Sequence, residues 1–208
     1  MSILDLKCGT DVAAMLAGMK VSTLQTWLRR NDQMSKPPAN AVDSRSENQI
    51  IAERPIEGGG SQGNHRIWTL CNVMEIAVAY KAFDDCGVDL ERALSLGAAF
   101  AYTGTLPGSM GLDLVGDVEY AKLMRQPGFP FYDRTQPALK TLAVVSPKGV
   151  TVLGWGEGYE PLREARVRLG GLTAWAAIEC QEIFFTVCEK LGAVPFDVLD
   201  EVYQISSV

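Results

Sequence analysis

The segment TDVAAMLAGMKVSTLQTWLRR, residues 10–30, predicts two short helices joined by a tight turn. Thr10 can cap the first helix, because its hydroxyl can accept a hydrogen bond from a free amide of the first turn. Val12 and Leu16 stand four residues apart and therefore share one helix face. Gly18 interrupts this pattern and supplies the turn, so the chain can change direction before the second helix begins.

The second helix separates its apolar side chains from its polar ones. Ser22 is its expected cap. Leu24, Trp27 and Leu28 form an apolar stripe at helical spacing, and we expect Trp27 to belong to the core. The side chains on the other faces are polar or cationic: Ser22, Thr23, Gln25, Thr26, Arg29 and Arg30. These residue types contact base edges and phosphates, so the segment predicts a helix-turn-helix whose second helix enters the major groove.

The residues that follow predict an exposed loop and then a β-hairpin. Residues 31–47 are polar and contain two consecutive prolines, which is typical of a loop. Residues 49–54 and 64–68 can form two strands around the glycine-rich turn at 58–63. The returning strand carries Asn64, His65 and Arg66. As a wing, this hairpin would hold those side chains near the flanking DNA backbone, where contacts position a protein rather than read sequence.

Two further helices complete the N-terminal half. Thr69 can cap a helix over residues 70–84, in which the apolar residues keep helical spacing. Asp89 can cap the next helix, which carries Gly97 on its apolar side. Residues 104–116 contain four glycines and a proline, which indicates a domain boundary or an extended connection.

The C-terminal half predicts a β-hairpin and a long apolar helix. Residues 139–145 and 150–155 alternate as strands do, and SPKG at 146–149 is a strong turn signal. Residues 173–191 form an apolar stretch that ends at a glycine, which predicts one long helix. Shorter helices are predicted over residues 161–169 and 195–203.

Together these elements predict an α+β protein of two domains. Residues 1–103 would form a winged helix-turn-helix that binds DNA. Residues 117–208 would form a small α+β domain with a hairpin and a long apolar helix, serving as a sensor, a dimerisation unit or a docking unit. Residues 1–70 hold eight basic and seven acidic side chains, so the net charge of −7 in the remainder fits a DNA-reading head attached to an acidic body.

Composition excludes several classes of function. The chain has 208 residues, 47% of them hydrophobic, with no apolar run long enough to cross a membrane and no start typical of a signal peptide. Its five cysteines form no CxxC pair and it has one histidine, so neither a zinc site nor a Ser-His-Asp set is expected. We therefore expect a cytoplasmic protein with no catalytic residues, metal or cofactor, rather than an enzyme.

Four motifs, in this order, resemble the DNA-binding domain of MerR-type regulators. They are DVAAML at 11–16, VSTLQTW at 21–27, NHRIWT at 64–69 and CGVDLERAL at 86–94. The family has an Arg-x-aromatic motif in its wing and Gly-x-x-Leu-Glu before the next helix. In this chain Arg66-Ile67-Trp68 and Gly87-Val88-Asp89-Leu90-Glu91 are similar to those motifs. The resemblance implies a winged helix-turn-helix over a little under half of the chain.

Three functions remain open from the sequence. The first is sequence-specific binding of double-stranded DNA by a transcriptional regulator. It would act as a homodimer, because one small head buries little DNA surface, and a small-molecule or protein effector could act on the C-terminal domain. The second is a phage-type factor for DNA packaging, like a small terminase subunit, or for recombination, like an excisionase. The third is a protein-interaction or ligand-binding protein whose winged domain contacts only protein.

Overall fold

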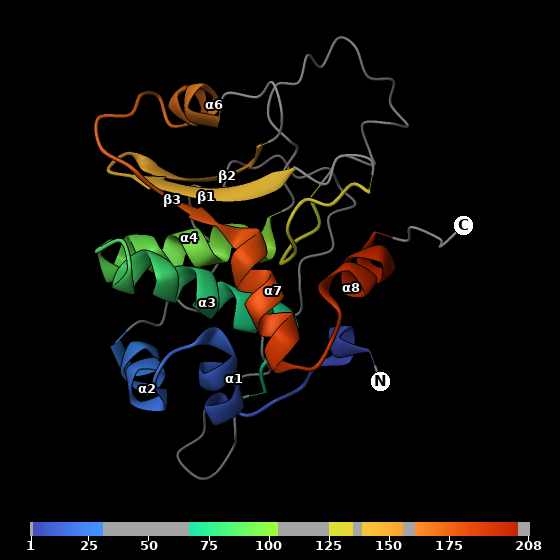
Figure 1. Ribbon diagram of the computed structural model, residues 1–208. Helices are drawn as coiled ribbons and strands as arrows, with labels where there is room; N and C mark the ends of the chain where they lie inside the picture. The colour runs from blue at the N-terminus through green and yellow to red at the C-terminus, as the bar shows by residue number, and fades with distance from the viewer. Residues whose placement is uncertain (1, 31–66, 104–124, 135–138, 156–160, 204–208) are drawn as a thin grey trace.

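A computed structural model gives the chain a mixed α+β fold, as the sequence predicted, and describes residues 2–30, 67–103, 125–134, 139–155 and 161–203. Its helices are η1 (Ile3–Asp5), α1 (Thr10–Ala17), α2 (Val21–Arg30), α3 (Leu70–Asp84), α4 (Leu90–Tyr102), α6 (Pro161–Arg168), α7 (Cys180–Lys190) and α8 (Pro195–Val202). Its strands are β1 (Lys140–Ser146), β2 (Gly149–Trp155) and β3 (Ala176–Glu179). The elements lie in layers, with α1 and α2 below α3 and α4, the sheet above them and α6 outermost (Figure 1).

The turn between α1 and α2 forms at Gly18, as predicted. This glycine has φ of 76°, a left-handed conformation that suits residues without a Cβ. Its N–H donates to the carbonyl of Met15, and the N–H of Met19 donates to the carbonyl of Ala14. Lys190 of α7 reaches this helix end, where its Nζ lies 2.9 Å from the Met15 carbonyl oxygen. The end of α1 is therefore fixed both by local turn geometry and by a cation from the C-terminal half.

Three details predicted for α1 and α2 are wrong. The N-cap of α1 is Gly9, because the Thr10 hydroxyl instead accepts a hydrogen bond from the indole of Trp68. Ser22 is not the N-cap of α2, because the helix begins at Val21 and the carbonyl of Lys20 accepts its first hydrogen bonds. Val12 does not share the buried face with Leu16, because its side chain remains 36% exposed. Contacts with residues distant in the sequence decide the caps and the burial at these positions, and local sequence patterns do not reveal those contacts.

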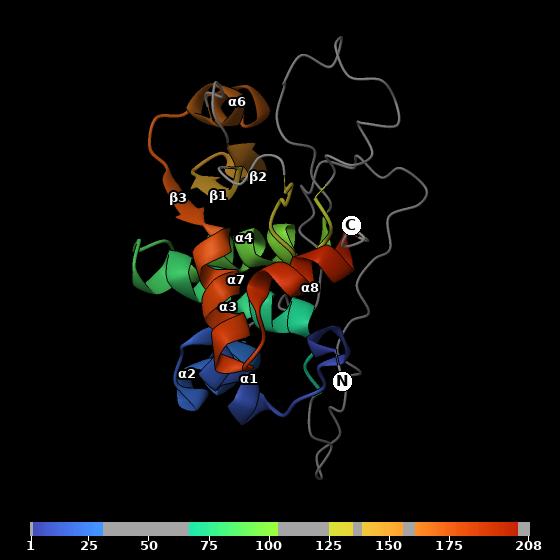
Figure 2. The ribbon, with the colours of Figure 1, turned by 45° about the vertical axis from the view of Figure 1, so that its right-hand side comes forward.

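The helix α3 is the centre of the hydrophobic core. Every residue from Asn72 to Ala79 is buried, because α1, α4 and α7 all pack against it. Its start was predicted correctly, since Thr69 caps it and forms a reciprocal capping box with Asn72. Asp89 caps α4 as predicted, by accepting a hydrogen bond from the N–H of Arg92. Figure 2 shows α7 crossing over α3.

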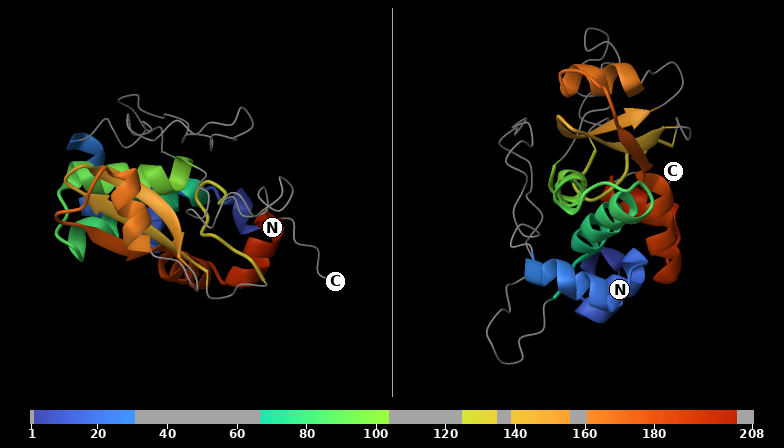
Figure 3. Two further views of the ribbon diagram at one scale, coloured as in Figure 1. Left: turned by 90° about the horizontal axis from the view of Figure 1, so that it is seen from above. Right: turned by 90° about the vertical axis from the view of Figure 1, so that its left-hand side faces the viewer.

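The sheet has the order β2-β1-β3 and is antiparallel throughout. The predicted hairpin is confirmed, with Ser146 opposite Gly149 at the turn. Side chains alternate between the two faces, so Ala143 and Val145 join the main core while Val144 joins a smaller cluster beneath α6. The right-hand view of Figure 3 shows α6 on one side of the sheet and α4 on the other.

The long helix predicted over residues 173–191 is wrong in its first part. Ala176–Glu179 is the strand β3, which pairs with β1 so that Val145 lies opposite Ala176. The helix α7 begins only at Cys180. An apolar run is compatible with a strand as well as with a buried helix, and pairing with a strand more than thirty residues away decided between them.

Both predicted domain ranges contribute to one hydrophobic core. Leu16, Trp27 and Ile76 belong to the same buried cluster as Val145 and Phe184. The predicted boundary at residues 104–116 lies outside the described residues. In the part of the chain that the structure describes, no helix has the length and hydropathy needed to cross a bilayer.

We predict that Gly97→Ala destabilises the fold strongly. A Cβ at this position would lie 2.3 Å from the Glu75 carbonyl oxygen and 3.0 Å from the Cβ of Ala79, so α3 and α4 could not keep their close approach. Overpacking of this kind costs about 1–3 kcal/mol or more. Chemical denaturation should show that loss, whereas Ser95→Ala, at a half-buried position where the hydroxyl bonds only to the Glu91 carbonyl of the same helix, should stay within about 0.5 kcal/mol of wild type. Equal stability of the two variants would contradict the proposed packing.

Candidate nucleic-acid interface

One face of α2 is polar and open to solvent. Ser22, Gln25 and Arg29 are exposed, and Thr26 between them is half-buried. These four positions follow spacings of three, four and seven residues, so they form a continuous stripe along the helix. The Thr26 hydroxyl donates to the Ser22 carbonyl at 2.8 Å, which leaves its methyl group and oxygen lone pairs for an external contact. Thr23 is half-buried beside this stripe.

The opposite face of α2 fixes how that stripe is presented. Leu24 and Trp27 are buried, and Leu28 packs against the same core. The Trp27 ring meets the Phe83 ring edge-on at 5.5 Å between centroids and the Tyr80 ring at 6.1 Å. The prediction that Trp27 is a core residue is therefore confirmed. Because both aromatic partners lie on α3, the rotation of α2 about its axis is set by the central helix.

The charge on α2 is entirely positive. Its ten residues include no Asp or Glu, while Arg29 and Arg30 occupy its last turn. Lys20, which is exposed, directly precedes its first turn. Backbone amides at a helix start attract anions, so a cation beside them favours a phosphate at that end.

The predicted wing is only partly described. Asn64, His65 and Arg66 lie outside the described residues, so their roles stay predictions. The described end of the segment is ordered against α1, since Trp68 and Cys8 exchange two backbone hydrogen bonds of 2.9 and 3.0 Å. Trp68 is buried, whereas its neighbour Ile67 is 40% exposed. The chain therefore enters α3 from a position beside the start of α1.

A buried polar cluster between α3 and α4 was not predicted from the sequence. The Tyr102 hydroxyl donates to a carboxyl oxygen of Glu75, and the Asn72 amide donates to the Tyr102 oxygen at 2.8 Å. Burial raises the pKa of Glu75 to about 8, while hydrogen bonding to Glu75 by Tyr102 and Asn72 acts in the opposite direction. Shifted carboxyl groups often mark active sites. Here Glu75 is only 2% exposed, and its neighbours satisfy it, so the cluster is explained as a structural link between two helices.

A buried arginine serves a comparable structural role at the end of α4. The Arg125 guanidinium donates to the carbonyl oxygens of Phe100 and Phe129, at 2.7 and 3.1 Å. It also lies 4.7 Å from the centre of the Phe100 ring. Burial lowers the pKa of Arg125 to about 10. The cation therefore satisfies carbonyl groups that the end of α4 leaves without helical partners.

The side chains that could ligate a metal ion do not cluster in the described part of the chain. Within ranges that the structure describes, no three His, Cys, Asp or Glu side chains converge on a point that could hold a metal ion. The described cysteines are free thiols, and Cys180 and Cys188 are buried in the core.

We predict that Glu75 makes stability fall as the pH rises from about 4.5 to 8. Between these values the unfolded carboxyl is ionised while the folded one keeps its proton, so folding must take up a proton. Denaturation at several pH values should show that the free energy of unfolding of wild type falls by up to about 1.4 kcal/mol per pH unit relative to that of Glu75→Gln, because the glutamine cannot ionise. The control Glu91→Gln changes an exposed carboxyl on α4 and should follow wild type. Parallel profiles for wild type and Glu75→Gln would contradict this assignment.

Comparison with known proteins finds no family model, curated protein or solved structure that matches the chain.

Proposed function

We propose that the chain binds double-stranded DNA with α2 in the major groove. The observation that carries this proposal is the division of α2 into a buried face of Leu24 and Trp27 and an exposed face of Ser22, Gln25 and Arg29. A recognition helix needs both faces, because one must fix the helix to the domain while the other reaches the bases. The left-handed turn at Gly18 and the packing of α1 against α2 support this proposal, because a helix-turn-helix needs a tight turn between two packed helices.

Different residues of this face would serve different purposes. Gln25 lies in the middle of the exposed stripe and can pair with an adenine edge through its amide. Arg29 lies one turn later, where a cation suits a phosphate or a guanine. Arg30 and the wing residues Asn64, His65 and Arg66 are proposed as flanking backbone contacts on the strength of the sequence alone.

We propose further that the chain is a regulator that binds DNA as a homodimer. One helix-turn-helix reads only a few base pairs, and pairing two heads on adjacent half-sites supplies affinity. The net charge of −7 over residues 71–208 opposes contact between that part and phosphate, so binding would be confined to the N-terminal head. Light scattering coupled to size-exclusion chromatography tests the assembly. A dimer supports the regulator, and a large ring would favour a packaging factor instead.

We predict that Arg29→Ala weakens binding to all duplex sequences and flattens its dependence on salt. Removing one phosphate contact should lower the slope of log K against log salt by about 1. Electrophoretic shift assays over a salt series measure both effects. Arg163→Ala is the matched control, because Arg163 is exposed on α6, at the opposite end of the layers from α2 (Figure 1). No duplex binding by wild type at low salt would refute the proposal.

We predict that Gln25→Ala changes base preference instead of salt dependence. A bidentate contact between an amide side chain and adenine discriminates by about 1–3 kcal/mol, which is roughly tenfold or more in affinity. Selection of binding sites from a random duplex library should therefore show relaxed preference at one position. If the variant selects the same base sequence and its binding depends less on salt, Gln25 contacts the phosphate backbone instead of a base.

A further inference from the structure

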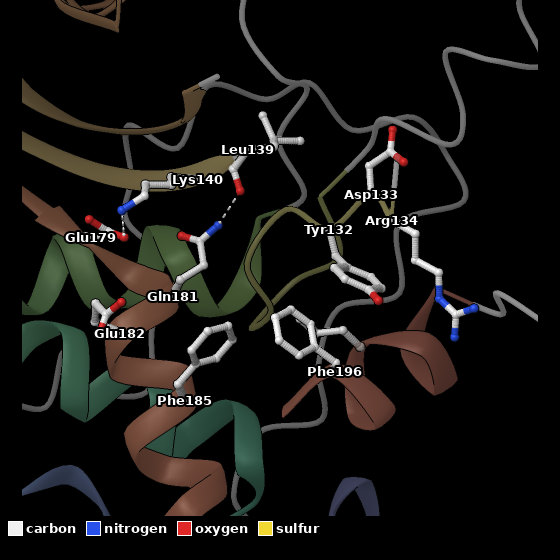
Figure 4. Close-up of a pocket in the computed structure, with 11 residues that line it drawn as sticks. Tyr132, Asp133, Arg134, Leu139, Lys140, Glu179, Gln181, Glu182, Phe185 and Phe196 are labelled. Atoms are coloured by element: carbon white, nitrogen blue, oxygen red, sulfur yellow. Dashed lines mark hydrogen bonds and ion pairs between the residues drawn. The ribbon is translucent and has the colours of Figure 1, made fainter. Parts of the chain in front are cut away.

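A pocket of about 310 Å³ lies between the start of β1, α7 and α8. Much of its lining is apolar, supplied by Tyr132, Leu139, Phe185, Phe196 and Leu199. The Phe185 and Phe196 rings meet edge-on at 5.3 Å, and the Tyr132 ring lies 6.0 Å from the Phe196 ring. Figure 4 shows these three rings grouped on one side of the pocket. Phe196 remains 51% exposed, so an apolar surface is left without a complete covering.

Most polar groups around the pocket already have partners. Lys140 forms an ion pair with Glu179, and Arg134 forms one with Asp200. The Gln181 side chain accepts from the Thr141 N–H. It also donates to the Leu139 carbonyl at 3.0 Å (Figure 4). These groups hold β1 and the segment before it against α7 and α8. They are therefore poorly placed to recognise a ligand, because a new contact would cost an existing one.

Glu182 is the exception among these groups. Its side chain is exposed in the first turn of α7, and within the described residues its carboxylate has no hydrogen bond or ion pair. It stands three residues before Phe185, so the two side chains share one face of the helix. Asp133 adds a second carboxylate to the lining, and the lining as a whole holds three acidic and two basic side chains. The pocket thus combines aromatic surface with the exposed carboxylate of Glu182.

We infer that this pocket binds a small aromatic molecule that carries a protonated amine. The aromatic body would lie against Phe185 and Phe196, and the ammonium group would pair with Glu182. A volume of 310 Å³ corresponds to roughly ten water-sized groups, so the ligand is of about that many non-hydrogen atoms. This inference stands independently of DNA binding, because none of the pocket residues lies on α1 or α2.

Calorimetric titration of the full chain, without DNA, tests the inference with three probes of one size. The probes are 2-phenylethylamine, 2-phenylethanol and phenylacetate at neutral pH, which differ mainly in charge. We expect the amine to bind about fivefold more tightly than the alcohol, which is about 1 kcal/mol, because only the ammonium group can pair with the exposed Glu182 carboxylate. Phenylacetate should bind most weakly. Equal affinities, tighter binding of phenylacetate, or no binding by the amine at millimolar concentration would each overturn the inference.

Two variants locate the site. Glu182→Gln should remove the preference for the amine and leave 2-phenylethanol unaffected, whereas Glu189→Gln, an exposed carboxyl later on α7 and outside the lining, should change nothing. Phe196→Ala should weaken the binding of the amine and of the alcohol to the same extent, because it removes half-exposed aromatic surface without opening the core. Unchanged amine binding by both Glu182→Gln and Phe196→Ala would place the ligand elsewhere and refute the assignment.

Discussion

The burial of α3 on all sides from Asn72 to Ala79 is the constraint on which the remaining structure depends. A helix in this position must satisfy its polar side chains internally, and it does so through Tyr102 on α4, which bonds to both Asn72 and Glu75. It must also let α4 approach closely, and Gly97 permits this because it presents no Cβ to the Glu75 carbonyl. The polar cluster and the glycine contact are therefore two consequences of one crowded helix pair.

The same helix sets the orientation of both candidate sites. Trp27 packs on Tyr80 and Phe83 of α3, which turns the polar stripe of α2 outward. On another side α7 packs across α3, with Phe184 and Cys188 in the shared core, and this fixes the face that carries Glu182 and Phe185. A physical connection also joins the regions directly, because Lys190 of α7 binds carbonyl groups at the end of α1.

Sequence patterns predicted the helices of the N-terminal half well, because their signals are local. Thr69 and Asp89 are caps whose partners lie three residues away, and Gly18 is a turn that only a residue without a Cβ adopts at little cost. The exposed stripe of Ser22, Gln25 and Arg29 follows from helical spacing once Leu24 and Trp27 are assigned to the core. Thr10 was misassigned as a cap because its actual partner, Trp68, is fifty-eight residues away.

By itself, the sequence determined the α+β class, the order of α1 to α4, the hairpin of β1 and β2 and the polar face of α2. Each of these depends on the spacing of residues within one element or one turn. Tertiary structure alone decided that Ala176–Glu179 is a strand, that Arg125 and Glu75 are buried, and that Phe185, Phe196 and Glu182 line one pocket. Those outcomes require segments distant in the chain to meet, and no local pattern encodes which partner a buried surface will find.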